Sequence, residues 1–246
     1  MTNSKPSPAP VTEMPLPAPQ PASLSARAYQ VILRRILKGA VPMGGELSRR
    51  RLAAELGMSI LPIAEALQRL QNEGIVETQP RVGTRVRVPT AADVRERYEV
   101  REALESQTAR LFCRMASDAD RAQLRQHAEC VDLLYRRYFE GSEADPEFLY
   151  QVQETHAEFH LQIAGVSGCG SLRTMLETNQ VLTFNWLYDV AAARPLLPAG
   201  FHAQLAEALC TQDEEAADRA MRAHVRYGLD QIIHRMPADF PAAAAR

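Results

Sequence analysis

The chain has 246 residues, of which 46% are hydrophobic, and a formal net charge of −2. This length is enough for two ordinary domains with sizeable cores. No apolar run approaches the length that spans a bilayer, and the first residues, Met1 to Pro6, lack the apolar core of a secretory signal. These features exclude a membrane protein, and we expect a cytoplasmic protein that contacts no membrane.

The placement of charges and cysteines indicates what kind of partner the chain binds and whether its thiols are reduced. Between Ser23 and Thr90 there are 11 Lys and Arg against 5 Asp and Glu, a balance of +6, whereas 91–246 holds 16 against 24, a balance of −8. A basic module joined to an acidic one indicates that only the first meets a polyanion, although a difference of this size also arises by chance. The four cysteines form no Cys-x-x-Cys pair, which favours reduced thiols over disulfides or a zinc ribbon.

The first third of the chain opens with a proline-rich lead and a helix. Residues 1–22 hold many of the 16 prolines and are expected to be a disordered lead. Ser23 or Ser25 caps a helix that runs to Lys38 and ends at Gly39. The pattern predicts an inward stripe of apolar side chains on this helix: Ala28, Val31, Ile32 and Ile36.

Two more helices and two strands follow. Ser48 caps a short helix that Gly57 ends, and Ser59 caps the next, with Pro62 in its first turn where the missing N–H costs little. Asn72-Glu73-Gly74 closes that helix, and strands are expected at 75–79 and 84–88. Three helices plus a two-stranded wing over 23–88 predict a winged helix-turn-helix.

Everything after the linker Pro89-Thr90 has helical period, so the fold class is mainly α. An all-α bundle is expected over 91–236, followed by a frayed tail at 237–246. Helices are predicted at 93–116, 118–140, 146–164, 171–192, 198–209 and 214–235.

Sequence motifs in both halves point to one family. The stretch Gly39 to Leu47, then Leu52-Ala53, Leu56-Gly57-Met58-Ser59, Pro62-Ile63, Glu65-Ala66-Leu67, Leu70, Glu73-Gly74 and Gly83-Thr84, resembles the GntR family of bacterial transcription regulators. The helical remainder resembles the FCD effector domain of the FadR-like branch. Its markers are Glu99-Val100-Arg101, Leu104-Glu105, Phe159-His160, His202, Ala208-Leu209, Asp213, Ala217 and His224. The resemblance implies a DNA reader with a ligand-binding domain.

The predicted recognition helix departs from that family. Where the family has arginine after the capping serine and again before Glu-Ala-Leu, this chain has Ile60 and Ala64, and Leu61 replaces a common threonine. Arginine reads guanine bidentately, whereas these side chains can only contact a thymine methyl group. Two interpretations stay open: an operator read through Gln68, apolar contacts and DNA shape, or apolar packing with weakened DNA reading. The DNA-binding candidates are Arg49, Arg50, Arg51, Ser59, Ile60, Leu61, Ala64, Gln68, Arg81, Gly83 and Arg85, with Arg87 as further wing charge.

Four histidines suggest a metal site in the helical domain. His156 and His160 lie four apart on one helix face, and His202 and His224 belong to two later helices that a bundle can bring to the same interior point. The family resemblance implies an aspartate and three histidines as ligands, with His156 at the aspartate position. Imidazoles suit zinc, nickel or copper better than magnesium or calcium. The alternative is that some of them are ordinary polar side chains, with a three-coordinate or empty pocket.

Arg101 is the candidate for ligand binding. The resemblance places it in the cavity, where a guanidinium can pair with a ligand carboxylate. The alternative is a helix-face ion pair with Glu105, worth little. Asn179 and Asn185 are expected to line the same cavity.

No enzyme is predicted. Glu158 lies two places after His156, so the spacing of a metalloprotease helix, His-Glu-x-x-His, is absent, and so are a phosphate loop and a nucleophile elbow. We expect a homodimeric repressor that binds double-stranded operator DNA and is controlled by a divalent metal and a small carboxylate metabolite. The alternative is a metal-dependent sensor or interaction protein that has lost specific DNA reading.

Overall fold

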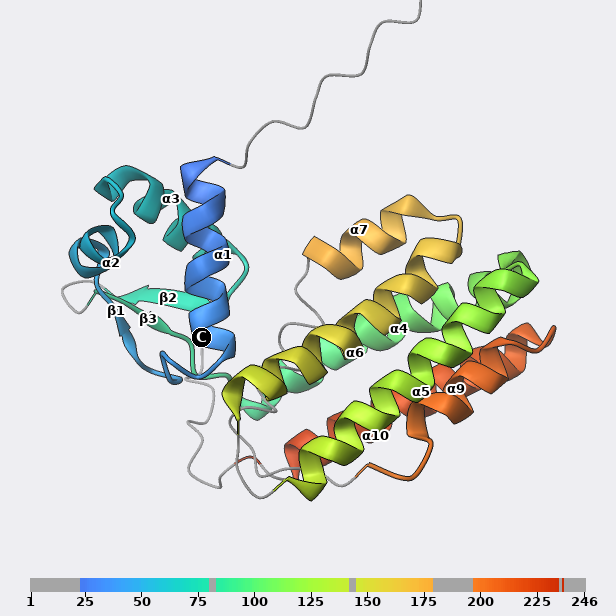
Figure 1. Ribbon diagram of the computed structural model, residues 1–246. Coiled ribbons are helices and arrows are strands. Elements are labelled where there is room, and N and C mark those ends of the chain that lie inside the picture. Colours follow the sequence, from blue (N-terminus) through green and yellow to red (C-terminus); the bar gives the residue numbers. More distant parts are fainter. Residues whose placement is uncertain (1–22, 80–82, 142–144, 179–196, 235, 237–246) are drawn as a thin grey trace, which may run out of the picture.

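A computed structural model describes residues 23–79, 83–141, 145–178, 197–234 and 236. The chain forms a small N-terminal head and a larger bundle of long helices (Figure 1). The predicted disordered lead 1–22 and frayed tail 237–246 lie outside the described residues, as do Arg81, Asn179 and Asn185. No helix among the described residues is long and apolar enough to cross a membrane.

The head contains the three predicted helices. They are α1 (Leu24–Leu37), α2 (Arg49–Leu56) and α3 (Ile60–Asn72). Ser23 and Ser48 accept N-terminal backbone N–H groups of α1 and α2 as predicted, and Gly57 ends α2 in the left-handed region at φ 62°. Ser59 is the N-cap of α3, but its side chain makes no capping bond. Val31 is 37% exposed, so the predicted inward stripe of α1 was wrong at that position, while Ala28, Ile32 and Ile36 are buried.

The wing is part of a three-stranded sheet. Strands β2 (Val76–Gln79) and β3 (Gly83–Val86) are antiparallel, with Thr78 opposite Thr84. The short β1 (Glu46–Leu47) pairs with the other side of β3, giving the order β1-β3-β2. A two-residue strand carries no periodic signal, which is why the sequence predicted two strands only.

The second region is all helical. Its helices are α4 (Ala91–Met115), α5 (Asp118–Glu140), α6 (Pro146–Val166), α7 (Gly170–Thr178), α9 (Phe201–Leu209) and α10 (Glu214–Ile233). Thr90 with Asp93 and Ser117 with Asp120 form capping boxes at the starts of α4 and α5. The helix predicted from Ser171 is described only as far as Thr178, and the helix predicted from Pro198 begins at Phe201.

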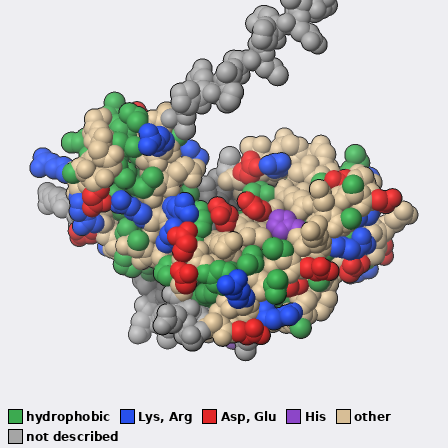
Figure 2. All heavy atoms as spheres, in the orientation of Figure 1, with side chains coloured by type: hydrophobic (Ala, Val, Ile, Leu, Met, Phe, Trp, Pro, Cys, Tyr) green, Lys and Arg blue, Asp and Glu red, His purple; other side chains and the backbone are tan. Residues whose placement is uncertain are grey.

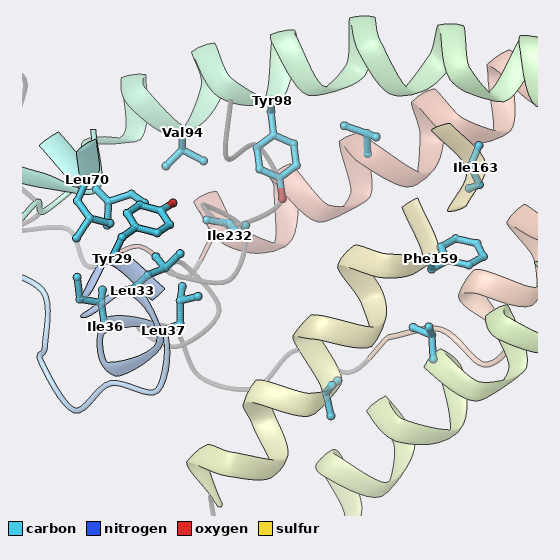
Figure 3. Close-up of a cluster of buried hydrophobic side chains, with 14 of the residues drawn as sticks. Tyr29, Leu33, Ile36, Leu37, Leu70, Val94, Tyr98, Phe159, Ile163 and Ile232 are labelled. Carbon is cyan, nitrogen blue, oxygen red and sulfur yellow. The ribbon is translucent and has the colours of Figure 1, made fainter. Parts of the chain in front are cut away.

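The buried apolar side chains of the head and of the bundle form one connected cluster (Figure 3). Tyr29, Ile36 and Leu70 are buried in the head, and Phe159 and Ile163 of α6 are buried in the bundle. Helix α10 packs along α4, and an added Cβ at Gly228 would lie 3.2 Å from the hydroxyl oxygen of Tyr98. This close approach places α4 and α10 on two sides of the interior in which the functional side chains lie.

Among the described residues, three ion pairs join the head to the bundle. Arg34 and Lys38 of α1 both reach Glu147 in the first turn of α6, with 3.1 Å between the Arg34 guanidinium and a Glu147 oxygen. Both cations also lie over the ring of Tyr150, at 4.8 and 5.1 Å from its centroid. Arg87, which the sequence suggested as further wing charge, pairs with Asp93 of α4 at 2.6 Å. Its charge is therefore used at the junction with the bundle.

Candidate functional site

The four predicted histidines meet inside the helical bundle. His156 and His160 come from α6, His202 from the first turn of α9 and His224 from α10. The ring centroids of His156 and His202 lie 4.8 Å apart, and those of His160 and His224 lie 5.2 Å apart. Residues separated by up to 68 positions thus share one buried pocket, which we call the histidine cluster.

Three of these side chains have the geometry of a metal site. One ring nitrogen from each of His156, His202 and His224 lies within 4.8 Å of the others. Nε2 of His202 and Nδ1 of His224 are buried and have no hydrogen-bond partner. An unpaired buried nitrogen costs free energy, and a cation at the centre of the cluster would remove that cost. The residues therefore fit an ion that prefers imidazole, such as zinc, nickel or copper.

Asp132 of α5 orients His202. One of its carboxylate oxygens lies 2.7 Å from Nδ1 of His202, and the two oxygens accept the backbone N–H groups of His202 and Ala203, each at 3.0 Å. The N-cap of α9 is Gly200, which has no side chain to offer, so Asp132 serves as the cap. Holding Nδ1 in this way leaves Nε2 directed at the cluster, and carboxylates orient histidine ligands in metal sites in the same way.

Tyr135, one turn further along α5, contacts two of the histidines. Its hydroxyl is hydrogen-bonded to Nδ1 of His156 at 3.1 Å. Its ring stacks on that of His202 with 5.6 Å between centroids and 10° between planes. Tyr135 therefore restricts the orientation of both rings.

His160 belongs to a second group, which also contains Glu105 and Arg101. Its Nδ1 lies 2.7 Å from one oxygen of Glu105, and the other oxygen accepts Nε of Arg101 at 2.6 Å. Arg101 can only donate, so Nε2 of His160 accepts its Nη2 N–H at 3.3 Å. Nε2 of His160 also lies 3.0 Å from Nε2 of His156. His160 is thus in the cluster, but its lone pair is already engaged by a cation.

Arg101 combines the two alternatives that the sequence left open. It does pair with Glu105 on the same helix, but both side chains are almost completely buried, at 2% and 1% exposed. The ion pair that the sequence left as an alternative therefore exists, but it is buried and not the weakly contributing helix-face pair of that alternative. Arg101 also lines a cavity beside the histidine cluster, together with Tyr98, Phe201, Tyr227 and Gly228.

The head presents a different surface. Ile60 and Leu61 at the start of α3 are 52% and 67% exposed, and Gln68 lies further along the exposed side, where it donates to Asn72 at 3.0 Å. Ala64, between them, is half-buried. Ile60 and Leu61 are therefore not packed against the described part of the bundle.

The basic side chains of the head are only partly free. Arg49, Arg50 and Arg51 are exposed at the start of α2, and Arg51 lies 3.5 Å from Glu55. Gly83, at the start of β3, has φ 108° and open space around it. Arg85 pairs with Glu77 across the wing at 2.6 Å, which reduces the positive charge that it offers to a ligand.

Comparison with known proteins decides the family. Residues 24–86 match the model described as "Bacterial regulatory proteins, gntR family", and residues 96–227, more than half of the chain, match the FCD domain. The chain belongs to the GntR family. It is a DNA-binding transcription regulator with an FCD domain, as predicted, and the family consists of regulators, not enzymes.

Named relatives of this GntR regulator control operons. The Nta operon transcriptional regulator of Aminobacter aminovorans is 29% identical over 77% of this chain and 85% of its own length. The probable D-xylose utilization operon transcriptional repressor of Paenarthrobacter nicotinovorans is 26% identical over 86% and 90%. The solved structure of E. coli McbR/YncC superposes with a TM-score of 0.68 at 23% identity, covering 87% of this chain and 98% of that one. This last likeness concerns the fold.

The electrostatics of the regulator's histidine cluster favour neutral rings. Burial, followed by repulsion from the neighbouring imidazoles, lowers the pKa of His156 and of His224 well below the ordinary value of 6.5. Burial alone would raise the pKa of Glu105, but the charge of Arg101 and the close contact with His160 outweigh it and lower that pKa to about 2. Glu105 is therefore a carboxylate that balances Arg101, and His156 and His224 are in the form that binds metals.

Sequence reasoning missed two residues of this GntR regulator's cluster. Asp132 and Tyr135 lie on α5, which carries none of the predicted ligands, and both are in sequence surroundings typical of an ordinary amphipathic helix. Gly200 at the start of α9 was the one available signal, because a helix without a capping side chain requires a partner from elsewhere. Nothing in the sequence says that this partner is 70 positions earlier.

Proposed function

We propose that this protein is a repressor in which a divalent transition metal and a small carboxylate metabolite, bound in the helical domain, control operator binding by the head. The observation that carries this proposal is the pair of unpartnered buried nitrogens, Nε2 of His202 and Nδ1 of His224, in a cluster of neutral imidazoles. His156, His202 and His224 would hold the ion, and His160 would complete the set. The ion would supply positive charge and an open position for a ligand oxygen.

Arg101 would bind the ligand carboxylate. In the structure its Nη2 donates to Nε2 of His160, the nitrogen that a fourth metal bond would need. A carboxylate that accepts this N–H would leave the lone pair of His160 free. Metal and carboxylate should therefore bind cooperatively, each strengthening the other, and linkage requires the effect to be mutual.

Two copies of the chain would act together on DNA. A pseudo-palindromic operator presents two half-sites, and a two-fold dimer places one recognition helix in each. The helical domain would hold the dimer, and ligand binding there would change the spacing of the two heads. Light scattering of the purified protein, alone and with operator DNA, tests the dimer.

Metal analysis tests the site. Purified protein should contain about one zinc-like ion per chain, in keeping with a single ligand set. His202→Ala and His224→Ala should lose the ion, whereas His234→Ala, which removes an exposed histidine of α10's C-cap, should retain it. Unchanged metal content in the first two variants would refute the site and leave the DNA-binding assignment intact.

Selection of DNA duplexes tests whether metal and carboxylate control operator binding. Duplexes selected from a random pool should share a pseudo-palindrome, and zinc together with a dicarboxylate such as succinate should change the affinity for them. Binding to random duplex without any sequence preference would favour the alternative of a sensor that no longer reads specific DNA.

A further inference from the structure

The beginning of α3 exposes two large aliphatic side chains. Ile63, Leu67 and Leu70 on the opposite side of the same helix are fully buried, while Ile60 and Leu61 remain 52% and 67% exposed. Exposed aliphatic side chains that lie side by side on a small domain indicate a contact surface. The question is what chemistry this surface contacts.

The surroundings of this pair favour a polyanion. Within the described residues, Arg49 and Arg50 at the start of α2 have no carboxylate within ion-pair distance, and the hydroxyl of Ser59 is not used to cap α3. Hydrophobic and basic side chains lie beside one another over the head (Figure 2). Charged and hydroxyl groups that flank an apolar pair match a duplex, whose phosphates border a groove lined by base edges.

Only one group in the major groove is complementary to these side chains. Guanine, adenine and cytosine present hydrogen-bonding groups there, and an aliphatic side chain pressed against them would leave those groups unpaired. Thymine presents a methyl group beside its O4. Burial of a methyl group against an aliphatic side chain is favourable and requires no hydrogen bond.

We propose that Ile60 and Leu61 each contact the 5-methyl group of a thymine, so that the operator half-site carries neighbouring A·T base pairs under the start of α3. This inference rests on operator binding by the head and specifies its sequence class. Gln68 lies two turns further along the helix and is the polar reader of the same face; its amide oxygen is left free by the bond that its nitrogen donates to Asn72. Successive residues of a helix project about 100° apart around its axis, so the two side chains would reach different bases of the half-site.

Replacement of thymine by deoxyuridine isolates the methyl group. The substitution keeps base pairing and every hydrogen-bonding group, and removes only the carbon that Ile60 or Leu61 would contact. Full-length protein is first used to select its preferred duplex, and each thymine of a half-site is then replaced in turn. We expect the dissociation constant to rise about fourfold at the contacted thymines and to stay unchanged at the others, the amount that one buried methyl group supplies.

Alanine variants of the two residues show which of them contacts each thymine methyl group. Leu61→Ala should bind the thymine duplex more weakly and should lose its sensitivity to deoxyuridine at one position only, and Ile60→Ala should do so at a neighbouring position. Leu133→Ala is the matched control, because Leu133 is a leucine of α5 with 59% exposure that is remote in sequence from the head. It should keep the wild-type response at every position.

Three results would overturn the proposal. Equal binding of the deoxyuridine and thymine duplexes would show that the protein contacts no methyl group. Selected half-sites with guanine under α3 would show the same. Both results are compatible with operator binding. A change of oligomeric state in Leu61→Ala with unchanged DNA affinity would assign the apolar pair to a second copy of the chain. Failure to bind any duplex would instead contradict operator binding itself.

Discussion

Asp132 and His202 lie 70 positions apart in the chain and are joined by two contacts. The carboxylate accepts the backbone N–H of His202, approaches Nδ1 of its ring at 2.7 Å and accepts the next backbone N–H, that of Ala203. One side chain thus caps α9 and orients its first ligand. Burial opposes ionisation of Asp132, but its bonds to His202 outweigh that effect and lower the pKa of the carboxyl group.

Asp132→Asn should therefore weaken metal binding. The amide keeps the size of the side chain but removes the charge, and loss of a carboxylate that orients a ligand usually lowers metal affinity about ten- to hundredfold. Competition with a chelator measures the change. Asp118→Asn, an exposed aspartate in the first turn of the same helix, is the control and should keep the wild-type affinity. Equal affinities in the two variants would mean that Asp132 is a helix cap only.

Glu105→Gln should destabilise the protein. The substitution leaves the buried cation of Arg101 without its counter-charge, and breaking a buried pair from one side usually costs about 3 kcal/mol or more. Urea denaturation of the metal-free protein measures the change in the free energy of unfolding. Glu99→Gln, at an exposed position of the same helix, should change it by no more than about 0.5 kcal/mol. If both variants have the wild-type stability, Arg101 does not depend on Glu105.

The metal-free protein should lose stability as the pH falls below about 6.5. Burial lowers the pKa of all four cluster histidines, so the folded chain binds fewer protons than the unfolded chain in this range. Stability then rises with pH and is complete above the ordinary pKa of 6.5, with up to about 1.4 kcal/mol lost per histidine and pH unit below it. Urea titrations at pH 8, 6.5 and 5.5 measure the slope. His234→Ala should keep the dependence of the free energy of unfolding on pH, and His156→Ala should reduce it. A free energy of unfolding that does not change with pH would mean that the cluster protonates freely in the folded protein.

Glu147→Lys should uncouple the head from the metal site. Glu147 and Tyr150 hold the two cations of α1 at the start of α6, and His156 follows on the same helix. Reversal of the charge would repel Arg34 and Lys38 without touching the cluster. We expect normal metal content, but the ratio of operator affinities with and without metal should move toward one in fluorescence anisotropy titrations. Glu158→Lys makes the same charge change at an exposed position of α6, and a ratio shifted equally by both variants would contradict a specific role of Glu147.

The sequence predicted the bounds of helices well where neighbouring residues set those bounds. Ser23, Ser48 and Gly57 bound the first two helices because capping and left-handed glycine depend on a few neighbouring residues. The same reasoning placed α5 at its observed bounds, 118–140. It missed β1, whose two residues are a strand only because β3 lies beside them. Val31 was assigned to the core for a similar reason, since its exposure depends on what α1 packs against.

The sequence by itself determined the family, the helical punctuation and the four histidines with their spacing, because those properties are carried by residue type and short-range order. The tertiary structure decided which ring nitrogens are free, namely Nε2 of His202 and Nδ1 of His224. Asp132, Tyr135 and Glu105 reach their histidines across the bundle, and Arg101 and Glu105 form a buried pair because α6 and α10 pack against α4. Hydrogen bonds and desolvation depend on distances of a few ångströms between helices, and no pattern along a single helix encodes them.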